Sequence, residues 1–387
     1  MELHSYFLLV GGLLLASLLA DELGHRMHIP RVTLLILLGL VIGKSGFDVL
    51  PDGFVVWNEA IASIGLTMIA FLLGGQLSYD TVRRHGKAIL VISLCVVTMT
   101  ATIVGVGLLV LGVAAPLALL LAAIATATAP ANVQDVVRQT GAAGPFTKSL
   151  LGIVAIDDAW GLVMFSMMFV AASMISGNGY SNSIEHGVWE IFSAVMVGCL
   201  IGFPAAYLTG RVRKGEPLQS EAIGSVFLCA GLSIWVGGSF LLAGMVAGAI
   251  IVNFAKHHER AFHEIENIEW PFMVLFFVLA GATLHMDNLA VIGPIVVAYI
   301  ILRTVSRLAA GWIGGGIANV PASHRRWIGI ALVPQAGVAL GMALVASGKL
   351  PDLANSLMGI TIATTVFFEL VGPFATQLAL RRVGEAK

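Results

Sequence analysis

The stretch Ser149-Leu-Leu-Gly-Ile-Val-Ala-Ile-Asp157-Asp158-Ala-Trp-Gly-Leu-Val-Met-Phe165 places two adjacent carboxylates inside an apolar run. A charged side chain at the centre of a bilayer costs roughly 2.5–3.5 kcal/mol on insertion scales, so carboxylates that persist there usually serve a function. Of the 387 residues, 58% are hydrophobic and 11% are charged, whereas soluble domains carry about 25% charged residues. The sequence therefore predicts an all-α polytopic membrane protein.

The distribution of positive charge predicts how the chain is threaded through the membrane. Polar and Gly/Pro clusters divide it into about thirteen apolar spans, each long enough to cross about 30 Å of hydrocarbon. In that arrangement seventeen Lys and Arg residues fall on one side, and only Lys44 and Lys349 fall on the other. Because positive residues gather on the cytoplasmic side, we expect the N-terminus outside and the C-terminus in the cytoplasm. The remaining basic residues, Arg303 and Arg307, lie inside the eleventh span.

Three pairs of sequence landmarks recur at separations of 204 to 206 residues. They are Phe71-Leu-Leu-Gly-Gly with Phe277-Val-Leu-Ala-Gly, Gly39 and Gly43 with Gly244 and Gly248, and Pro130 with Pro334. The shift corresponds to seven spans, an odd number, so the second copy would cross the membrane in the opposite sense. We therefore predict inverted-topology repeats joined by the seventh span.

Two spans look broken, one in each copy. The fifth reads Ala125-Thr-Ala-Thr-Ala-Pro-Ala-Asn-Val-Gln-Asp135, and the twelfth reads Ala331-Leu-Val-Pro-Gln-Ala-Gly-Val338. Proline removes a backbone donor, and nearby polar side chains can satisfy the freed groups. Two ordinary proline kinks are the alternative, which the repeat relation disfavours. The residues assigned to the crossing breaks are Thr126, Ala129, Pro130, Pro334 and Gln335.

Asp157 and Asp158 are the expected ion- and proton-binding residues. Adjacent helical residues point about 100° apart, so one carboxylate can hold a monovalent metal cation while the other turns toward a neighbouring helix. Cation and proton then compete for one carboxylate, which is the minimum machinery of antiport. Thr126, Thr128 and Asn132 offer the hard oxygen ligands that suit sodium.

The basic residues of the eleventh span are expected to act as charge partners. Arg303 lies near the bilayer centre and is the expected partner of Asp157 when no cation is bound. It is not expected to be the proton carrier, because an arginine guanidinium stays protonated in proteins. Arg307 is expected to reach toward the cytoplasm or to pair with Glu369. The alternative, that the aspartates only neutralise buried arginines, remains open, and the roles of Glu369 and Asp135 are not assigned.

Together these features resemble the monovalent cation:proton antiporters, in particular the two-aspartate branch that includes NapA-type sodium/proton antiporters. The resemblance covers nearly the whole chain and implies an NhaA/NapA-like antiporter fold, a homodimer in lipid, and a bacterial inner (plasma) membrane location. It implies scaffold helices in 1–86 and 215–288, a linker in 177–214, and a core in 87–176 and 289–387 that moves the ion site like an elevator. It also implies that Asp158 is the principal ion carrier and that Asp157 pairs with Arg303.

Two positions depart from the family pattern. Many members carry Thr-Asp-Pro at the first break, where this chain has Thr128-Ala129-Pro130. Electrogenic two-aspartate members usually carry lysine where Arg303 stands, and arginine there resembles the electroneutral branch. The sequence therefore leaves the transport stoichiometry open.

The leading interpretation is a sodium (or lithium)/proton antiporter that is not an enzyme, needs no cofactor and binds no nucleic acid. A potassium/proton antiporter of the same fold is the alternative, although potassium efflux members usually carry a nucleotide-binding domain, which we do not expect here. A sodium-coupled organic-solute symporter is a further alternative but would need a roomier polar crevice. An intramembrane aspartyl protease is disfavoured because its aspartates come from different helices, and buried opposite charges would obstruct a channel.

Overall fold

The computed structural model describes residues 3–27, 31–43, 46–47, 52–77, 79, 86–176, 184–209, 218–255, 258–282, 289–335 and 337–386, and their regular structure is helical throughout. The first half contains α1 (Leu3–Met27), α2 (Arg31–Ile42), α3 (Asp52–Gln76), α5 (Gly86–Val110), α6 (Ala115–Ile124), α7 (Pro130–Thr140), α8 (Pro145–Ser176) and α9 (Ile184–Thr209). The second half contains α10 (Leu218–Val236), α11 (Phe240–Phe254), α12 (His258–Ala282), α13 (Leu289–Ile317), α14 (Ala322–Ala331), α15 (Val338–Lys349) and α16 (Pro351–Val383).

The helices have the lengths and composition of a polytopic membrane protein. Within the described residues, eight are long and apolar enough to cross a bilayer, and five shorter ones are also apolar. Both predicted interruptions are confirmed, because the fifth span is the helix pair α6 and α7 and the twelfth is α14 and α15. The predicted all-α membrane fold is therefore confirmed, while the number of spans stays a prediction.

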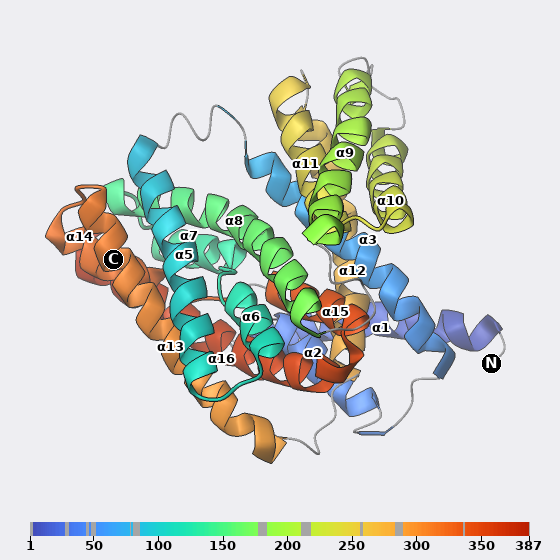
Figure 1. Cartoon of the computed structure of the whole chain (residues 1–387), viewed down its shortest axis with the longest axis horizontal. Coiled ribbons are helices and arrows are strands. Elements are labelled where there is room, and N and C mark those ends of the chain that lie inside the picture. Colours follow the sequence, from blue (N-terminus) through green and yellow to red (C-terminus); the bar gives the residue numbers. More distant parts are fainter. Residues whose placement is uncertain are drawn as a thin grey trace.

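The helices pack as two groups (Figure 1). In one group α11 packs against α3 and α9, α12 packs against α2 and α3, and α10 packs against α9. In the other group α13 packs against α5, α14 and α16, while α8 packs against α5 and α6. Contacts of α3 with α8 and α15 join the groups. The division into a scaffold and a moving core remains a prediction.

Glycines set the closest helix contacts in the first group. A Cβ atom on Gly39 of α2 would collide with the carbonyl of Val278 on α12, and one on Gly248 of α11 would collide with the carbonyl of Phe71 on α3. Small residues allow such close backbone approach in membrane helices. By the repeat offsets α2 and α12 correspond to α11 and α3, so the two contacts join equivalent helix pairs with the copies exchanged, as expected when two related copies interlock.

Candidate functional site

The two broken spans meet inside the second helix group. The α6 helix ends at Ile124 and α7 starts at Pro130, where the missing proline N–H costs no helical hydrogen bond. The backbone N–H of Ala129, in the first break, donates to the carbonyl of Pro334, in the second, at 3.3 Å. Residues 125–129 are almost fully buried. The junction therefore concentrates helix ends and free carbonyls in an interior without solvent contact.

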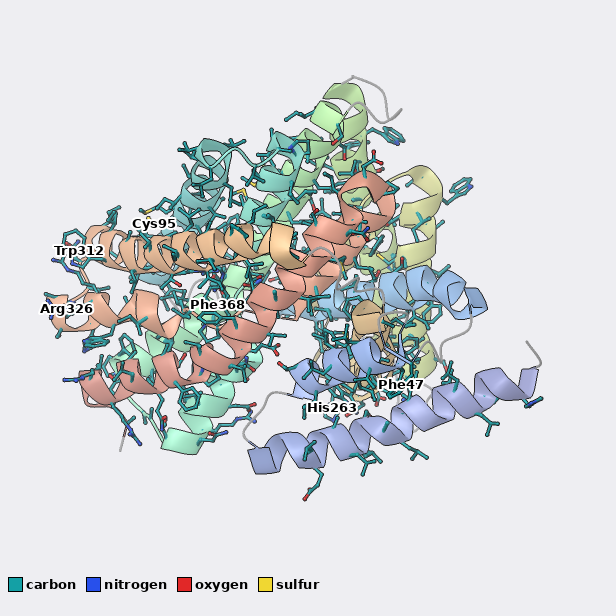
Figure 2. All side chains as sticks on the ribbon, turned by 90° about the horizontal axis from the view of Figure 1, so that it is seen from below. Phe47, Cys95, His263, Trp312, Arg326 and Phe368 are labelled. Atoms are coloured by element: carbon teal, nitrogen blue, oxygen red, sulfur yellow. The ribbon has the colours of Figure 1, made fainter. Side chains whose placement is uncertain are left out.

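Arg303 of α13 lies at this junction and is fully buried. Its guanidinium donates to two carbonyls from each break, those of Ala125 (3.0 Å), Ala127 (2.8 Å), Val333 (2.6 Å) and Pro334 (3.4 Å). It also stacks over the ring of Phe368 of α16, with 4.3 Å between the guanidinium carbon and the ring centroid. Figure 2 shows Phe368 inside the molecule, well away from Trp312 and Arg326 at its end. Arg303 thus places a positive charge at the C-terminal, electronegative ends of α6 and α14.

Arg307, one turn further along α13, is the partner of Asp157. Its Nη1 lies 2.8 Å from Asp157 Oδ2 and 3.1 Å from Thr128 Oγ1, and both members of the ion pair are fully buried. Its Nη2 donates to three carbonyls of the first break, those of Ala125 (3.1 Å), Thr126 (2.6 Å) and Ala127 (3.3 Å).

The predicted pair of Asp157 with Arg303 is therefore wrong, as is the expectation that Arg307 reaches the cytoplasm or Glu369. Arg303 and Arg307 are separated by about 6 Å along one face of α13. Which of them meets Asp157 depends on how α13 is placed axially against α8, and Arg303 is already held by the carbonyls of both breaks.

Asp157 is surrounded by polar side chains from two other helices and from the first break. Oδ2 accepts a hydrogen bond from the Thr128 hydroxyl as well as from Arg307. Oδ1 accepts a longer one, 3.4 Å, from Ser93 of α5. Ser93 was missed at the sequence level. Its only signal is that it is a small polar residue within an apolar span, which many structural serines share.

The other predicted site residues differ in how close they lie to the Asp157–Arg307 ion pair. The backbone of Asp158 belongs to α8, but its side chain lies outside the described part of the structure. Asn132 is partly buried in the first turn of α7. The Thr126 hydroxyl donates to the carbonyl of Ala123 at 2.6 Å, so it caps α6, and its carbonyl serves Arg307. Gln335 follows the junction and meets Tyr299 instead of the ion pair.

Glu369 of α16 forms a separate buried contact. Its Oε2 accepts a 2.8 Å hydrogen bond from the hydroxyl of Thr33 on α2, across the boundary between the two helix groups. Glu369 is 3% exposed, so it is the fourth buried Asp, Glu, Lys or Arg in the described part of the chain, beside Asp157, Arg303 and Arg307.

The helix that carries the aspartates is capped by the C-terminal segment, which lies beside α14 (Figure 1). Glu385 accepts hydrogen bonds from the backbone N–H groups of Phe146 (2.9 Å) and Thr147 (2.8 Å), and from the Thr147 hydroxyl (2.7 Å). Partial burial opposes ionisation, but these donors and the nearby His324 outweigh it and lower the pKa of Glu385. Its negative charge therefore faces the positive N-terminal end of α8.

The chain matches the family described as "Sodium/hydrogen exchanger, transmembrane" over residues 10–382. It is 19% identical to the ammonium/H⁺ antiporter subunit AmhT of Alkalihalophilus pseudofirmus over 97% of this chain and 98% of that protein. It is 22% identical to the Na⁺/H⁺-K⁺ antiporter GerN of Bacillus cereus, over 93% and 94% of the two chains. The Na⁺/H⁺ antiporter ApNhaP of Aphanothece halophytica is also 22% identical, over 66% of this chain and 51% of that protein.

The fold matches a solved antiporter structure. The sodium proton antiporter MjNhaP1 of Methanocaldococcus jannaschii superposes with a TM-score of 0.75 at 20% identity, covering 100% of this chain and 96% of that one. The predicted antiporter fold and the resemblance stated from the sequence are confirmed. The chain therefore belongs to the transmembrane sodium/hydrogen exchanger family, whose members are integral membrane antiporters.

Proposed function

We propose that this protein is a secondary active sodium (or lithium)/proton antiporter in which the cation and protons compete at the Asp157–Asp158 pair. The observation that carries the proposal is the fully buried Asp157, held by Arg307 and Thr128 beside the two broken spans. Broken helices place unsatisfied backbone groups at the bilayer midplane, which is where ion sites of secondary transporters lie.

The contacts of Asp157 suggest different roles for the two carboxylates: Asp157 holds the buried arginine, and Asp158 exchanges ions. Asp157 is the counter-ion of the buried Arg307 guanidinium, so its carboxylate is already engaged in that pair. Asp158, the next residue of α8, is then the carboxylate that exchanges its proton for the cation. Thr128 and Asn132 are proposed to supply oxygen ligands. One exchanging carboxylate carries one proton for one monovalent cation, so the exchange is proposed to be electroneutral.

Alternating access is proposed to occur by an elevator movement of the second helix group against the first. The separate packing of the two groups supports this, because Arg303 ties both breaks to α13 and lets that group move as one body. The proposal includes a homodimer in the bacterial inner membrane, with the N-terminus outside and the C-terminus cytoplasmic.

The transported cation is proposed to be sodium or lithium. Hard oxygen ligands suit sodium and lithium. The names of the relatives include ammonium, sodium and potassium, so a potassium or ammonium exchanger of the same fold is the second candidate.

The test is proton flux in proteoliposomes that hold the purified protein and a pH-sensitive dye. Sodium, lithium, potassium and ammonium are added in turn, first with the membrane potential clamped and then with an imposed potential. The controls are protein-free vesicles and Asp352→Asn, which neutralises an exposed carboxylate in the first turn of α16.

Proton movement driven by sodium or lithium and unaffected by the imposed potential is the expected result. A response to potassium or ammonium alone would move the protein to the second candidate. A flux that rises with the imposed potential would refute the one-for-one exchange, and silence with all four cations would refute the antiporter.

A further inference from the structure

A second group of buried polar side chains lies on the opposite side of Arg303 from the ion pair. Tyr299 precedes Arg303 by one turn of α13, whereas Arg307 follows it by one turn. Tyr299 and Gln335 are both fully buried, and the Gln335 amide lies 3.5 Å from the Tyr299 hydroxyl. The other amide atom, Gln335 Oε1, is buried without a hydrogen-bond partner among the described residues.

One face of α16 extends this group. Thr376 donates to the carbonyl of Ala331 at 3.0 Å, Gly372 abuts Pro334, and Phe368 lies under Arg303. The next two positions on that face, at spacings of three and four residues, are Thr365 and Thr361. That face therefore continues from the second break toward the start of α16.

The register of α13 against α16 places the threonines near Tyr299. Two contacts fix it, because Arg303 meets Phe368 and Ile292 meets Gly359. The two helices therefore run in the same direction, and Tyr299, between the two contacts, comes level with Thr364 and Thr365. The Thr364 hydroxyl is satisfied by carbonyls of its own helix, those of Ile360 and Thr361.

Thr361 and Thr365, in contrast, have buried hydroxyl oxygens without a hydrogen-bond partner in the described structure. With Gln335 Oε1 they make three unpartnered oxygens on two neighbouring elements. Buried polar groups are costly to leave unpaired, and natural proteins satisfy nearly all of them with protein or ordered water. The three oxygens therefore point to a ligand held between α13, α16 and the second break.

We propose that Tyr299, Gln335, Thr361 and Thr365 enclose a small pocket that binds ordered water. Hydroxyl and amide groups both donate and accept hydrogen bonds, and a buried water typically makes about three such bonds to otherwise unpaired groups. A cation is disfavoured because the four residues carry no negative charge and Arg303 lies one turn away. The site does not depend on the proposed ion exchange, because none of its four residues belongs to the Asp157 ion pair.

X-ray radiolytic footprinting of the full-length protein tests the pocket directly. The pulse turns bound water into hydroxyl radicals that modify adjacent side chains, and mass spectrometry in H₂¹⁸O locates the products. Tyr299 is expected to be modified several-fold faster than Phe276, an equally buried aromatic residue whose ring packs against that of Phe277. Tyr79, which is 68% exposed, is the positive control for bulk solvent. Labelling of Tyr299 no faster than that of Phe276 would overturn the proposal.

Matched valine variants supply the second readout. Thr361→Val with Thr365→Val should bring Tyr299 labelling down to the level of Phe276 and lower the thermal midpoint, because each removes a ligand of the water. Thr364→Val, on the same helix, should leave the labelling unchanged. If the pocket is dry, the double variant removes unpaired oxygens and raises the midpoint, and that result would also overturn the proposal.

Discussion

Removing the side chain of Arg307 should be far more damaging to Asp157 than removing that of Arg303. In Arg307→Met the Asp157 carboxylate stays fully buried and, of its described contacts, keeps those with the Thr128 and Ser93 hydroxyls. Removing one member of a buried ion pair typically costs about 3–5 kcal/mol because the other charge is left uncompensated. At about 2 °C for each kcal/mol in a large domain, the thermal midpoint should fall by roughly 6–10 °C.

The same reasoning predicts a rescue. Asp157→Asn combined with Arg307→Met removes both charges, so the double variant should recover at least half of the lost midpoint. Arg303→Met also loses its four carbonyl contacts, but none of the described contacts of Arg303 is an ion pair with a carboxylate. Asp157→Asn should therefore not rescue Arg303→Met.

The assay is a double-mutant cycle on the purified protein in detergent, followed by the fluorescence of its seven tryptophans. If Arg307→Met does not yield folded protein, Arg307→Lys keeps the charge and loses the planar fork, and its cycle with Asp157→Asn carries the same sign. Equal coupling of Asp157 to both arginines, or coupling to Arg303 alone, would refute the assignment of Arg307 as the partner.

Three further predictions concern neighbouring features. Thr128→Val removes a hydrogen-bond donor to Asp157 and should raise the apparent KM for sodium roughly tenfold in proteoliposomes. Ser93→Ala loses only a 3.4 Å hydrogen bond and should change that KM by less than about threefold. Equal effects of the two variants would contradict the site geometry. Glu385→Gln should lower the thermal midpoint at pH 7 by the equivalent of about 0.3–1 kcal/mol. Because the pKa of Glu385 is lowered in the folded protein, its stabilisation is present above the ordinary pKa near 4.5 and is lost as the pH falls through the lowered pKa. A difference in midpoint between the variant and the unmodified protein that persists in acid would refute this. Gly248→Ala should lower the free energy of unfolding by about 1–3 kcal/mol, because its Cβ atom meets the main chain of α3. Gly231→Ala has open space around the new Cβ atom and should be neutral or stabilising. Thermal unfolding of the two variants measures this contrast, and equal midpoints would contradict it.

The breaks could be predicted from sequence because proline leaves a direct physical mark. Pro130 and Pro334 remove backbone donors in the middle of apolar spans, and their matching separation relates the two copies. Gly39 and Gly248 could be found from the sequence as landmarks of the repeat, whereas the helix contacts that they allow came from the structure.

The partner of Asp157 could not be predicted in the same way. Arg303 and Arg307 occupy one face of α13, and both lie close enough to the midplane to satisfy any argument from depth. The choice depends on the axial placement of two helices far apart in sequence. Ser93 and Glu385 were missed for a related reason, because a lone serine in a span and a glutamate near the C-terminus have many ordinary explanations until the fold places them.

The central claim is that the cation displaces a proton from Asp158 while Asp157 stays paired with Arg307. The most direct test is the number of protons released when sodium binds to the purified protein in weakly buffered detergent, measured with a pH indicator. The account predicts one proton released for each sodium bound, and none in Asp158→Asn. Full release in Asp158→Asn, or two protons for each sodium in the unmodified protein, would contradict it.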